Sequence, residues 1–454
     1  MRVASRVSLF SIALLAWSVA ASSQTSDVPV ANSTSSVQRP LRLEPGLEDR
    51  HARYGPSTSK KIAMLPVHLL ELPFVVVNYP FEKWIVRKQP LEPVLLGLTA
   101  WRRLRQNGIL IRWGGFGPNA GAGGGLGYRL PESVTGRSRL QIFGGLTSGG
   151  YEQFYAQFDT PQDADLRLDL RGEFFDRGRE RFYGVGLQSS VDDRSSYDLA
   201  TTRVRARVDW NAWTRLHLQG AVAFSRHDVH EGEDERYPTA QELFPGVEGL
   251  EGRFDFVEYG AALSWEGRDS GQYASRGTYA RAAVRLAEGV RDTDNAYTKY
   301  SFELQHYLPL PGVRRVLALR FFSTVTDNRS GPDRPIPLFR LETLGGPNDL
   351  RGYRDSRFTD KDIFFGNVEY RFPFWWIEHE SGIGIDALAF FDYGTALPNL
   401  EKMQQRDFRS SSGLGFRVMT YHSFLGQVDF GWTPEGSRVH AGLRWNFNGL
   451  DDTE

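Results

Sequence analysis

The segment Arg203-Val204-Arg205-Ala206-Arg207-Val208-Asp209-Trp210 alternates charged and apolar side chains without a break. Successive side chains of a β-strand point to opposite faces, so this segment has one charged face and one apolar face. Residues 166–174 and 299–308 repeat the pattern. An arginine facing lipid at mid-membrane costs about 2–4 kcal/mol, whereas one facing a wet lumen costs little. The alternation is therefore typical of a transmembrane β-barrel.

The same period of two continues on both sides of this segment, from residue 109 to the C-terminal region. It predicts an all-β chain, an antiparallel transmembrane barrel of about 16 strands. The connections that follow odd-numbered strands are long and polar, as expected for outer loops opposite short periplasmic turns; they include 177–197, 228–253, 327–361 and 394–408. The predicted strand centres lie near residues 112, 125, 142, 155, 170, 205, 220, 260, 282, 302, 319, 368, 387, 414, 428 and 442.

The composition of the 454-residue chain agrees with a barrel and excludes several classes of function. Mean hydropathy is −0.41 although 13% of residues are aromatic, which suits strands with a polar inner face and aromatic girdles. With 54 basic and 55 acidic residues, the chain lacks the basic excess of a nucleic-acid-binding protein. It has no cysteine, which excludes disulfides, thiolate metal sites, cysteine nucleophiles and lipoprotein modification.

The N-terminal residues resemble a secretory signal, with Arg2 and Arg6 before an apolar run at 7–19. We therefore expect a signal peptide at 1–22, a periplasmic segment at 23–107, a barrel at 108–448 and a tail at 449–454. The periplasmic segment is expected to be flexible at first and helical at the end. A helix at 93–107 begins at a proline and ends before a glycine. It is either an interfacial or plugging helix below the barrel, or a partner-binding motif.

Four glycines share one face of the second predicted strand, at positions 121, 123, 125 and 127. Glycine weakens a strand unless another group must come close to the backbone. We therefore expect this luminal face to be crowded by an inserted loop or helix. A phosphate-cradling loop is the alternative, but the spacing differs from GxGxxG and no strand-to-helix context follows.

The long connection after the eleventh predicted strand contains Leu344-Gly345-Gly346 and then Leu350-Arg351-Gly352-Tyr353. This resembles the lumen-loop motif of the BamA/TamA superfamily, also called the bacterial surface antigen family. In that family the motif folds back into the barrel from the sixth outer loop, where our strand count also places it. Further matching segments occur in the family's order at 276–279, 367–373, 390–394 and 412–417.

The resemblance implies that Arg351 inserts among luminal carboxylates. Alternation places Glu369 on the inward face of one strand, and Asp386 with Asp392 on the inward face of the next. An arginine can hold a carboxylate with two parallel donors, so these three acids are predicted to hold the loop. The alternatives are ordinary luminal charges beside a solvent-exposed loop, or a catalytic carboxylate pair.

The two ends of the chain bear on the family assignment. Residues 440–447 resemble the C-terminal signal by which outer-membrane barrels are recognised for insertion, with Gly442, Trp445 and Phe447 at the characteristic positions. The chain departs from that pattern by continuing to Glu454. Residues 24–107 are too short and too interrupted by proline for the periplasmic POTRA domains of the family. We therefore expect a member without POTRA domains, which puts a general barrel-assembly role in doubt.

The resemblance predicts a non-enzymatic barrel of the bacterial outer membrane that inserts or translocates proteins or lipids, through a gated lumen and a seam between first and last strands. Its expected partners are outer-membrane lipid, client molecules, and the barrel-assembly machinery for its own insertion. A passive or gated pore is the alternative, and an outer-membrane enzyme is a third. Histidines such as His217, His227, His230 and His306 have no companion serine motif. His227 and His230 beside acidic residues suggest a metal site, but a solvated acidic loop is preferred. No catalytic residue, cofactor or metal is expected.

Overall fold

The computed structural model describes residues 71, 107–113, 120–161, 163–271, 273–291, 293–376, 383–420 and 424–442. The chain divides into two compact units, residues 1–73 and 74–454, and the sheet belongs to the second. The predicted signal peptide, the predicted helix at 93–107 except its last residue, and the predicted tail at 449–454 lie outside the described residues. No described helix is both long enough and apolar enough to cross a membrane.

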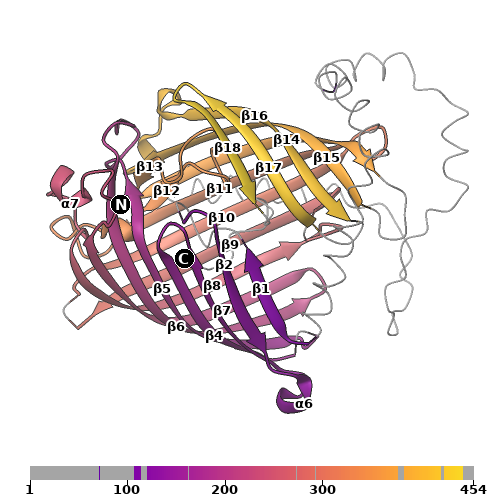
Figure 1. The fold of residues 1–454 in the computed structure, drawn as a ribbon, viewed down its shortest axis with the longest axis horizontal. Coiled ribbons are helices and arrows are strands. Elements are labelled where there is room, and N and C mark those ends of the chain that lie inside the picture. Colours follow the sequence, from indigo (N-terminus) through magenta and orange to yellow (C-terminus); the bar gives the residue numbers. More distant parts are fainter. Residues whose placement is uncertain are drawn as a thin grey trace, which may run out of the picture. The chain divides into compact units, whose positions relative to one another are not determined.

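Sixteen antiparallel strands form one sheet in chain order, which curves round into a barrel wall (Figure 1). The prediction of a barrel of about 16 strands is confirmed. The strands are β1 (Ile109–Trp113), β2 (Gly123–Arg129), β3 (Arg139–Thr147), β4 (Tyr151–Asp159), β5 (Leu166–Phe182), β6 (Ser195–Trp213), β7 (Leu216–Glu231), β8 (Gly252–Glu266), β9 (Gly277–Val290), β10 (Ala296–Pro309), β11 (Val316–Asn328), β14 (Asp362–Trp376), β15 (Ile383–Leu397), β16 (Arg409–Thr420), β17 (Phe424–Thr433) and β18 (Gly436–Gly442).

Connections at one end of the barrel are long, and we call this end the loop end. It carries the helix α7 (Ala240–Leu243), η2 (Leu400–Lys402) and η3 (Gln405–Asp407). At the other end, the turn end, the short helix α6 (Glu132–Thr135) lies between β2 and β3. We call residues 329–361, the loop-end connection between β11 and β14, the lumen loop. It contains η1 (Leu338–Arg340) and a small two-stranded sheet of β12 (Glu342–Leu344) and β13 (Phe358–Asp360).

The strands at the loop end extend further than predicted. The stretch 177–197 was expected to be a loop, but β5 continues to Phe182 and β6 begins at Ser195. The ladder persists there, with Glu180 paired to Tyr197. A strand of about 10 residues already crosses a bilayer. Beyond that length the outward face no longer has to be apolar, so the alternation ends before the strand does.

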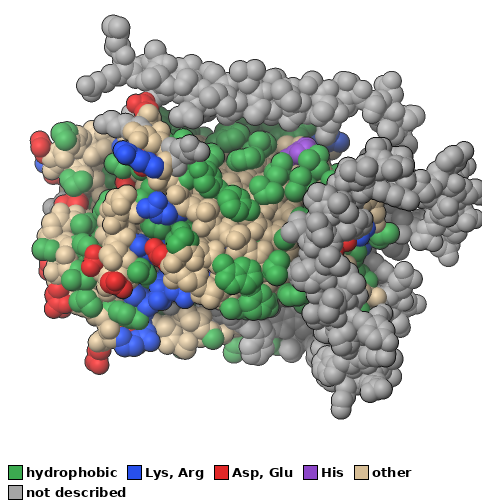
Figure 2. Space-filling model, turned by 90° about the horizontal axis from the view of Figure 1, so that it is seen from above, with side chains coloured by type: hydrophobic (Ala, Val, Ile, Leu, Met, Phe, Trp, Pro, Cys, Tyr) green, Lys and Arg blue, Asp and Glu red, His purple; other side chains and the backbone are tan. Residues whose placement is uncertain are grey.

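The two faces of the sheet have opposite character. On β6, Val204 is 60% exposed and Trp210 is 49% exposed, whereas Arg203, which directly precedes Val204, is 8% exposed. Figure 2 shows hydrophobic side chains across the middle of the wall and charged ones gathered toward the end that carries α7. Apolar side chains outside and charged ones inside reverse the arrangement of a soluble protein. They match strands that face lipid outside and a polar lumen inside.

In the described part of the chain, the glycines of β2 are crowded, but by the neighbouring strand β3 and not by an inserted loop or helix. A side chain at Gly125 would meet the ring of Phe143 on β3, and one at Gly127 would meet the Ile142 carbonyl. Phe143 in turn stacks on Tyr155 of β4, with ring centroids 5.3 Å apart. Within the described residues, the crowding expected from an inserted loop or helix therefore comes from a cross-strand aromatic ring.

Candidate functional site

The tip of the lumen loop lies between β12 and β13, and residues 350–353 form a tight turn there. Gly345 and Gly346 have φ angles of +116° and +113°, a conformation that glycine adopts without strain. The Asp349 carboxylate accepts hydrogen bonds from the backbone N–H of Gly345 and of Leu350, and the Tyr353 N–H donates to the Leu350 carbonyl. These bonds set the direction in which Arg351, at the apex of the turn, leaves the backbone.

Arg351 is 1% exposed and contacts the inward faces of β14 and β15. Its Nε and Nη2 donate to the two carboxylate oxygens of Asp392 at 3.0 and 2.6 Å, and Nη1 donates to Glu369 at 2.5 Å. The Arg351 backbone N–H also donates to Asp392, at 3.1 Å. The guanidinium lies 3.6 Å from the ring centroid of Phe390. This is the bidentate, charge-assisted geometry that arginine makes best.

The two carboxylates have further partners on β14–β17. Nε of Arg371 donates to Glu369 at 2.9 Å, and Ser411 donates to Asp392 at 3.1 Å. Nη2 of Arg417 lies 3.9 Å from Glu369, while both of its terminal nitrogens donate to Asp429 at 2.8 and 3.0 Å. We call these six charged residues the Arg351 network: Arg351, Glu369, Arg371, Asp392, Arg417 and Asp429. Three guanidiniums face three carboxylates, which is how buried charges are tolerated.

The other residues of the loop motif pack beside the network. Leu350 and Tyr353 join an apolar cluster with Leu344 and Phe358 of the loop and residues of the wall. Tyr353 meets the ring of Phe358 edge to face, with centroids 5.1 Å apart. The Gly352 carbonyl accepts a hydrogen bond from Thr433 of β17 at 3.4 Å. All four motif residues therefore contact the wall or the loop's own small sheet.

The structure places Asp386 away from Arg351, contrary to the expectation that three acids surround it. Asp386 accepts a hydrogen bond from the indole N–H of Trp376 at 2.8 Å and lies 3.6 Å from Arg314, in the β10–β11 turn. It does share the inward face with Asp392. However, six residues of strand separate the two acids by roughly 20 Å, so Asp386 belongs to the turn end.

The C-terminal residues are described only in part. Gly442 is the last residue of β18 and pairs with Gln427 of β17, whereas Trp445 and Phe447 lie outside the described residues. Two residues upstream of Gly442, Nε2 of His440 lies 2.9 Å from the Arg351 carbonyl oxygen. The loop tip thus reaches the last described strand as well as β14–β17.

Sequence reasoning did not assign Arg417 and Asp429 to the site. Both lie on predicted strands, and alternation puts Arg417 on the face of Ser411. The signal was present, but the pairing depends on a register that sets Gly415, not Arg417, directly opposite Asp429. A side chain at Gly415 would meet Asp429 at 2.1 Å, so the glycine leaves room for the ion pair.

A second arginine of the lumen loop, Arg340 in η1, contacts the opposite part of the wall. Its Nη2 donates to Glu258 of β8 at 2.7 Å and to Ser225 of β7 at 3.0 Å. The Arg340 guanidinium lies 4.9 Å from the ring centroid of Phe256. The loop therefore makes buried ionic contacts with two groups of strands that are far apart in the sequence.

His227 of β7 belongs to this second contact. Its Nδ1 lies 3.1 Å from the Thr201 hydroxyl and its Nε2 lies 2.9 Å from Nη2 of Arg340. Both ring nitrogens therefore have partners, and one of those is a cation. The described residues contain no group of three or more histidine, cysteine and acidic side chains able to hold a metal ion.

Gly431 of β17 offers a test of how closely the loop approaches the wall. A Cβ there would lie 2.6 Å from the Arg351 carbonyl oxygen and 2.8 Å from Gly352 Cα. Both are backbone atoms, so Gly431→Ala should push the loop tip outward and lower stability by about 1–3 kcal/mol. The readouts are the midpoint of denaturant unfolding and the rate of protease cleavage in the lumen loop. Gly220→Ala, where nothing lies within 4 Å, is the matched control. Equal values for both variants would contradict this placement of the loop.

These features define a class: a membrane-spanning β-barrel in which a buried arginine of a loop-end connection binds inward-facing acids of the wall. The chain belongs to the Omp85 superfamily, whose domain model matches residues 134–448. Among solved structures it is similar to BamA from Haemophilus ducreyi lacking POTRA domains 1–3, with a TM-score of 0.53 and 14% identity over 75% of this chain and 68% of that one.

It is also similar to CdiB from Escherichia coli, with a TM-score of 0.51 and 12% identity over 73% of this chain. The match spans 61% of the CdiB chain. At these identities the likeness establishes the fold. No curated protein is similar enough in sequence to count as a relative.

Proposed function

We propose that this chain works at the bacterial outer membrane as a non-enzymatic barrel that inserts or translocates proteins or lipids, with the lumen loop held in place by Arg351. The observation that carries the proposal is the Arg351 network, in which Arg351 joins the loop tip to two strands through Glu369 and Asp392. Membership of the superfamily supports the location and the kind of function.

In this proposal the loop is a fixed part of the lumen wall. A set of buried, mutually paired charges is costly to separate, since breaking one partner leaves another buried without compensation. The loop would therefore keep β14–β17 in register while the edge strands β1 and β18 remain free to change their contacts. Outer-membrane lipid and the client molecules are the proposed partners. Gly442, Trp445 and Phe447 are proposed as the signal for the barrel's own insertion by the assembly machinery.

The function is tested by comparing a strain that lacks this gene with its parent. We expect selective loss of particular outer-membrane proteins, or a changed lipid composition, because the client proteins or lipids are no longer inserted or translocated. Expression of the wild-type chain should restore the profile. Arg351→Ala, compared at matched barrel abundance with Arg334→Ala in an exposed part of the same loop, should restore it less well.

An unchanged protein and lipid profile would contradict the proposal. Steady single-channel conductance of the purified barrel, together with that unchanged profile, would instead identify a pore. Turnover of lipid or peptide by the purified chain would contradict the non-enzymatic role.

A further inference from the structure

The inner wall at the turn end contains a cavity of about 370 Å³, built mainly by β1–β4. Four guanidiniums line it, those of Arg112, Arg129, Arg139 and Arg207, against the single carboxylate of Asp159. None of these residues belongs to the Arg351 network. An excess of positive charge in a concave site is the arrangement that attracts and holds an anion.

Strand register explains why these side chains meet. Arg129 of β2 pairs with Gln141 of β3, which pairs with Gln157 of β4, so the three lie in one row on the same face. Two residues nearer the turns, Arg139 pairs with Asp159 in a second row. The arginines are thus held on rigid neighbouring strands, which limits the entropy lost when they bind a ligand.

Hydrogen bonds hold Asp159, which lines the cavity, and Asp169 on the neighbouring strand β5. Gln157 donates to Asp159 at 3.0 Å and to Asp169 of β5 at 2.6 Å, and Gln141 donates to Gln157 at 3.2 Å. Arg205 donates to Asp169 at 3.1 Å. Arg205 offsets the charge of Asp169, which does not line the cavity, so Asp159 is the one carboxylate among the lining residues that opposes an incoming anion, against four guanidiniums.

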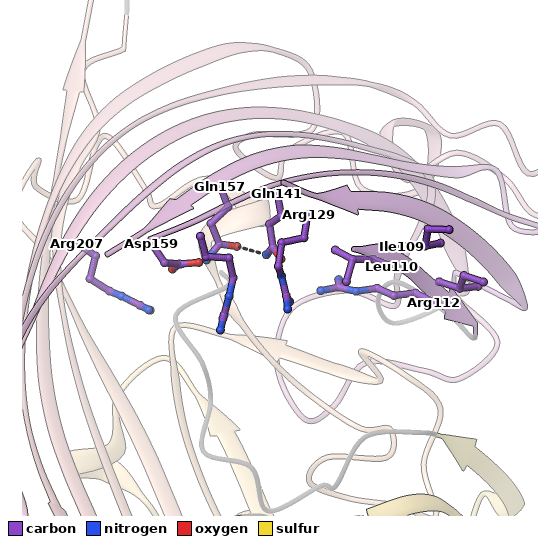
Figure 3. A pocket seen from close by; sticks show the side chains of 10 residues that line it. Ile109, Leu110, Arg112, Arg129, Gln141, Gln157, Asp159 and Arg207 are labelled. Atoms are coloured by element: carbon purple, nitrogen blue, oxygen red, sulfur yellow. Dashed lines mark hydrogen bonds between the residues drawn. The ribbon is translucent and has the colours of Figure 1, made fainter. Parts of the chain in front are cut away.

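The arginines approach the cavity from different sides. Figure 3 shows Arg207 extending from one side, Arg112 from the other, and Arg129 between them. The Arg112 guanidinium is steadied by two rings, with centroids of Phe143 and Tyr155 at 4.8 and 5.4 Å. Arg207 keeps a 3.2 Å contact with Asp209. Planar guanidiniums arranged around one space match the several oxygens of a phosphate group.

We propose that this cavity binds a phosphate monoester group carrying a small organic or acyl portion. The volume lies within the range of small-molecule sites and exceeds what one phosphate group needs. Leu110 of β1, two residues before Arg112 and therefore on the same face of the strand, also lines the cavity and provides apolar surface for the rest of the ligand. The site takes either a lipid headgroup or a soluble phosphate ester, and it does so whether or not the barrel inserts or translocates clients.

The experiment uses the purified full chain in a non-ionic detergent. Binding of glycerol 3-phosphate and of short-chain phosphatidic acid is measured by calorimetry and by phosphorus NMR line broadening, with short-chain phosphatidylcholine as the zwitterionic control. We expect saturable binding of a phosphate monoester and none of the control. Arg129→Gln/Arg139→Gln should weaken binding by at least roughly tenfold, because two charge-assisted hydrogen bonds to the phosphate are lost and a tenfold change corresponds to only about 1.4 kcal/mol.

The matched control is Arg137→Gln, in the connection between β2, which carries Arg129, and β3, which carries Arg139. The Arg137 side chain is 72% exposed, pairs with Asp163 and does not line the cavity. It should bind as the wild type does. The single variant Arg112→Gln, on the first strand, provides a second test if the double variant folds poorly.

Each outcome decides the proposal. Binding of phosphatidic acid alone supports it with a lipid as the source, and binding of glycerol 3-phosphate as well supports it with a soluble ester. Absence of saturable binding by either probe would overturn it. Equal binding by the wild type, Arg112→Gln and the double variant would overturn it too, because the phosphate would then bind elsewhere.

Discussion

Replacing Arg351 with alanine is expected to lower the free energy of unfolding by about 3–5 kcal/mol. The change removes three hydrogen bonds to Asp392 and Glu369 that the guanidinium makes, and both acids are fully buried. Each carboxylate would keep neighbours such as Arg371 and Ser411, but Asp392 would lose its only bidentate partner among the described residues. An uncompensated buried charge makes truncation of such a pair costly.

The measurement is denaturant unfolding of the refolded barrel, together with the rate of protease cleavage within the lumen loop. Arg334→Ala is the control, because Arg334 lies in the same loop in an ion pair with Asp294 that is more than half exposed. Such pairs contribute about 0–1 kcal/mol. Asp392→Asn serves as a milder second variant should Arg351→Ala fail to refold. If Arg351→Ala and Arg334→Ala unfold at the same denaturant concentration and are cleaved equally fast, the anchoring role is refuted.

The second large effect is expected at the other contact of the lumen loop, where Arg340→Ala should lower the free energy of unfolding by about 3 kcal/mol. Glu258 is 6% exposed and would lose its 2.7 Å partner, and His227 would lose a ring-nitrogen contact. This is the lower end of the range of about 3–5 kcal/mol expected for breaking a buried ion pair. We expect the lower end because Arg285 lies 3.9 Å from Glu258 and offsets part of its charge.

The two contacts can be told apart by where the loop becomes accessible. In Arg340→Ala, protease cleavage should increase near η1 and β12, while the tip around Arg351 stays protected by its own network. In Arg351→Ala the tip should become accessible first. Cleavage that rises equally along the whole loop in both variants would show that the lumen loop is released as a single unit.

Much of the fold could be predicted because a strand's period of two is a local property of the backbone. The segment at 203–210 specifies which of its side chains face inward whatever its neighbours are, and repeated alternation led to the correct strand number. Strand ends were less predictable. Where β5 and β6 leave the region that needs an apolar exterior, hydrogen bonding continues to Phe182 and Ser195 without any sequence pattern to mark it.

The candidate site was predictable in part for the same reason. Alternation indicated that Glu369, Asp386 and Asp392 face inward, and the loop motif suggested that Arg351 meets acids. Which acids Arg351 meets depends on how far along the strand each acid lies. Asp386 lies too near the turn end, where it binds Trp376 instead. How far the loop tip reaches into the barrel depends on the path of the 33-residue lumen loop. That loop has no repeating sequence pattern from which the position of Arg351 could be calculated.

By itself, then, the sequence determined the fold class, the inward face of each strand and the residue types available to the lumen, because these follow from local backbone geometry. Only the tertiary structure decided the partners: Arg417 with Asp429, Arg340 with Glu258, and the arginines of the β1–β4 cavity with one another. These pairs depend on strand register and on the closure of long connections. Both are set by the summed energy of many distant contacts, so no short stretch of sequence encodes them.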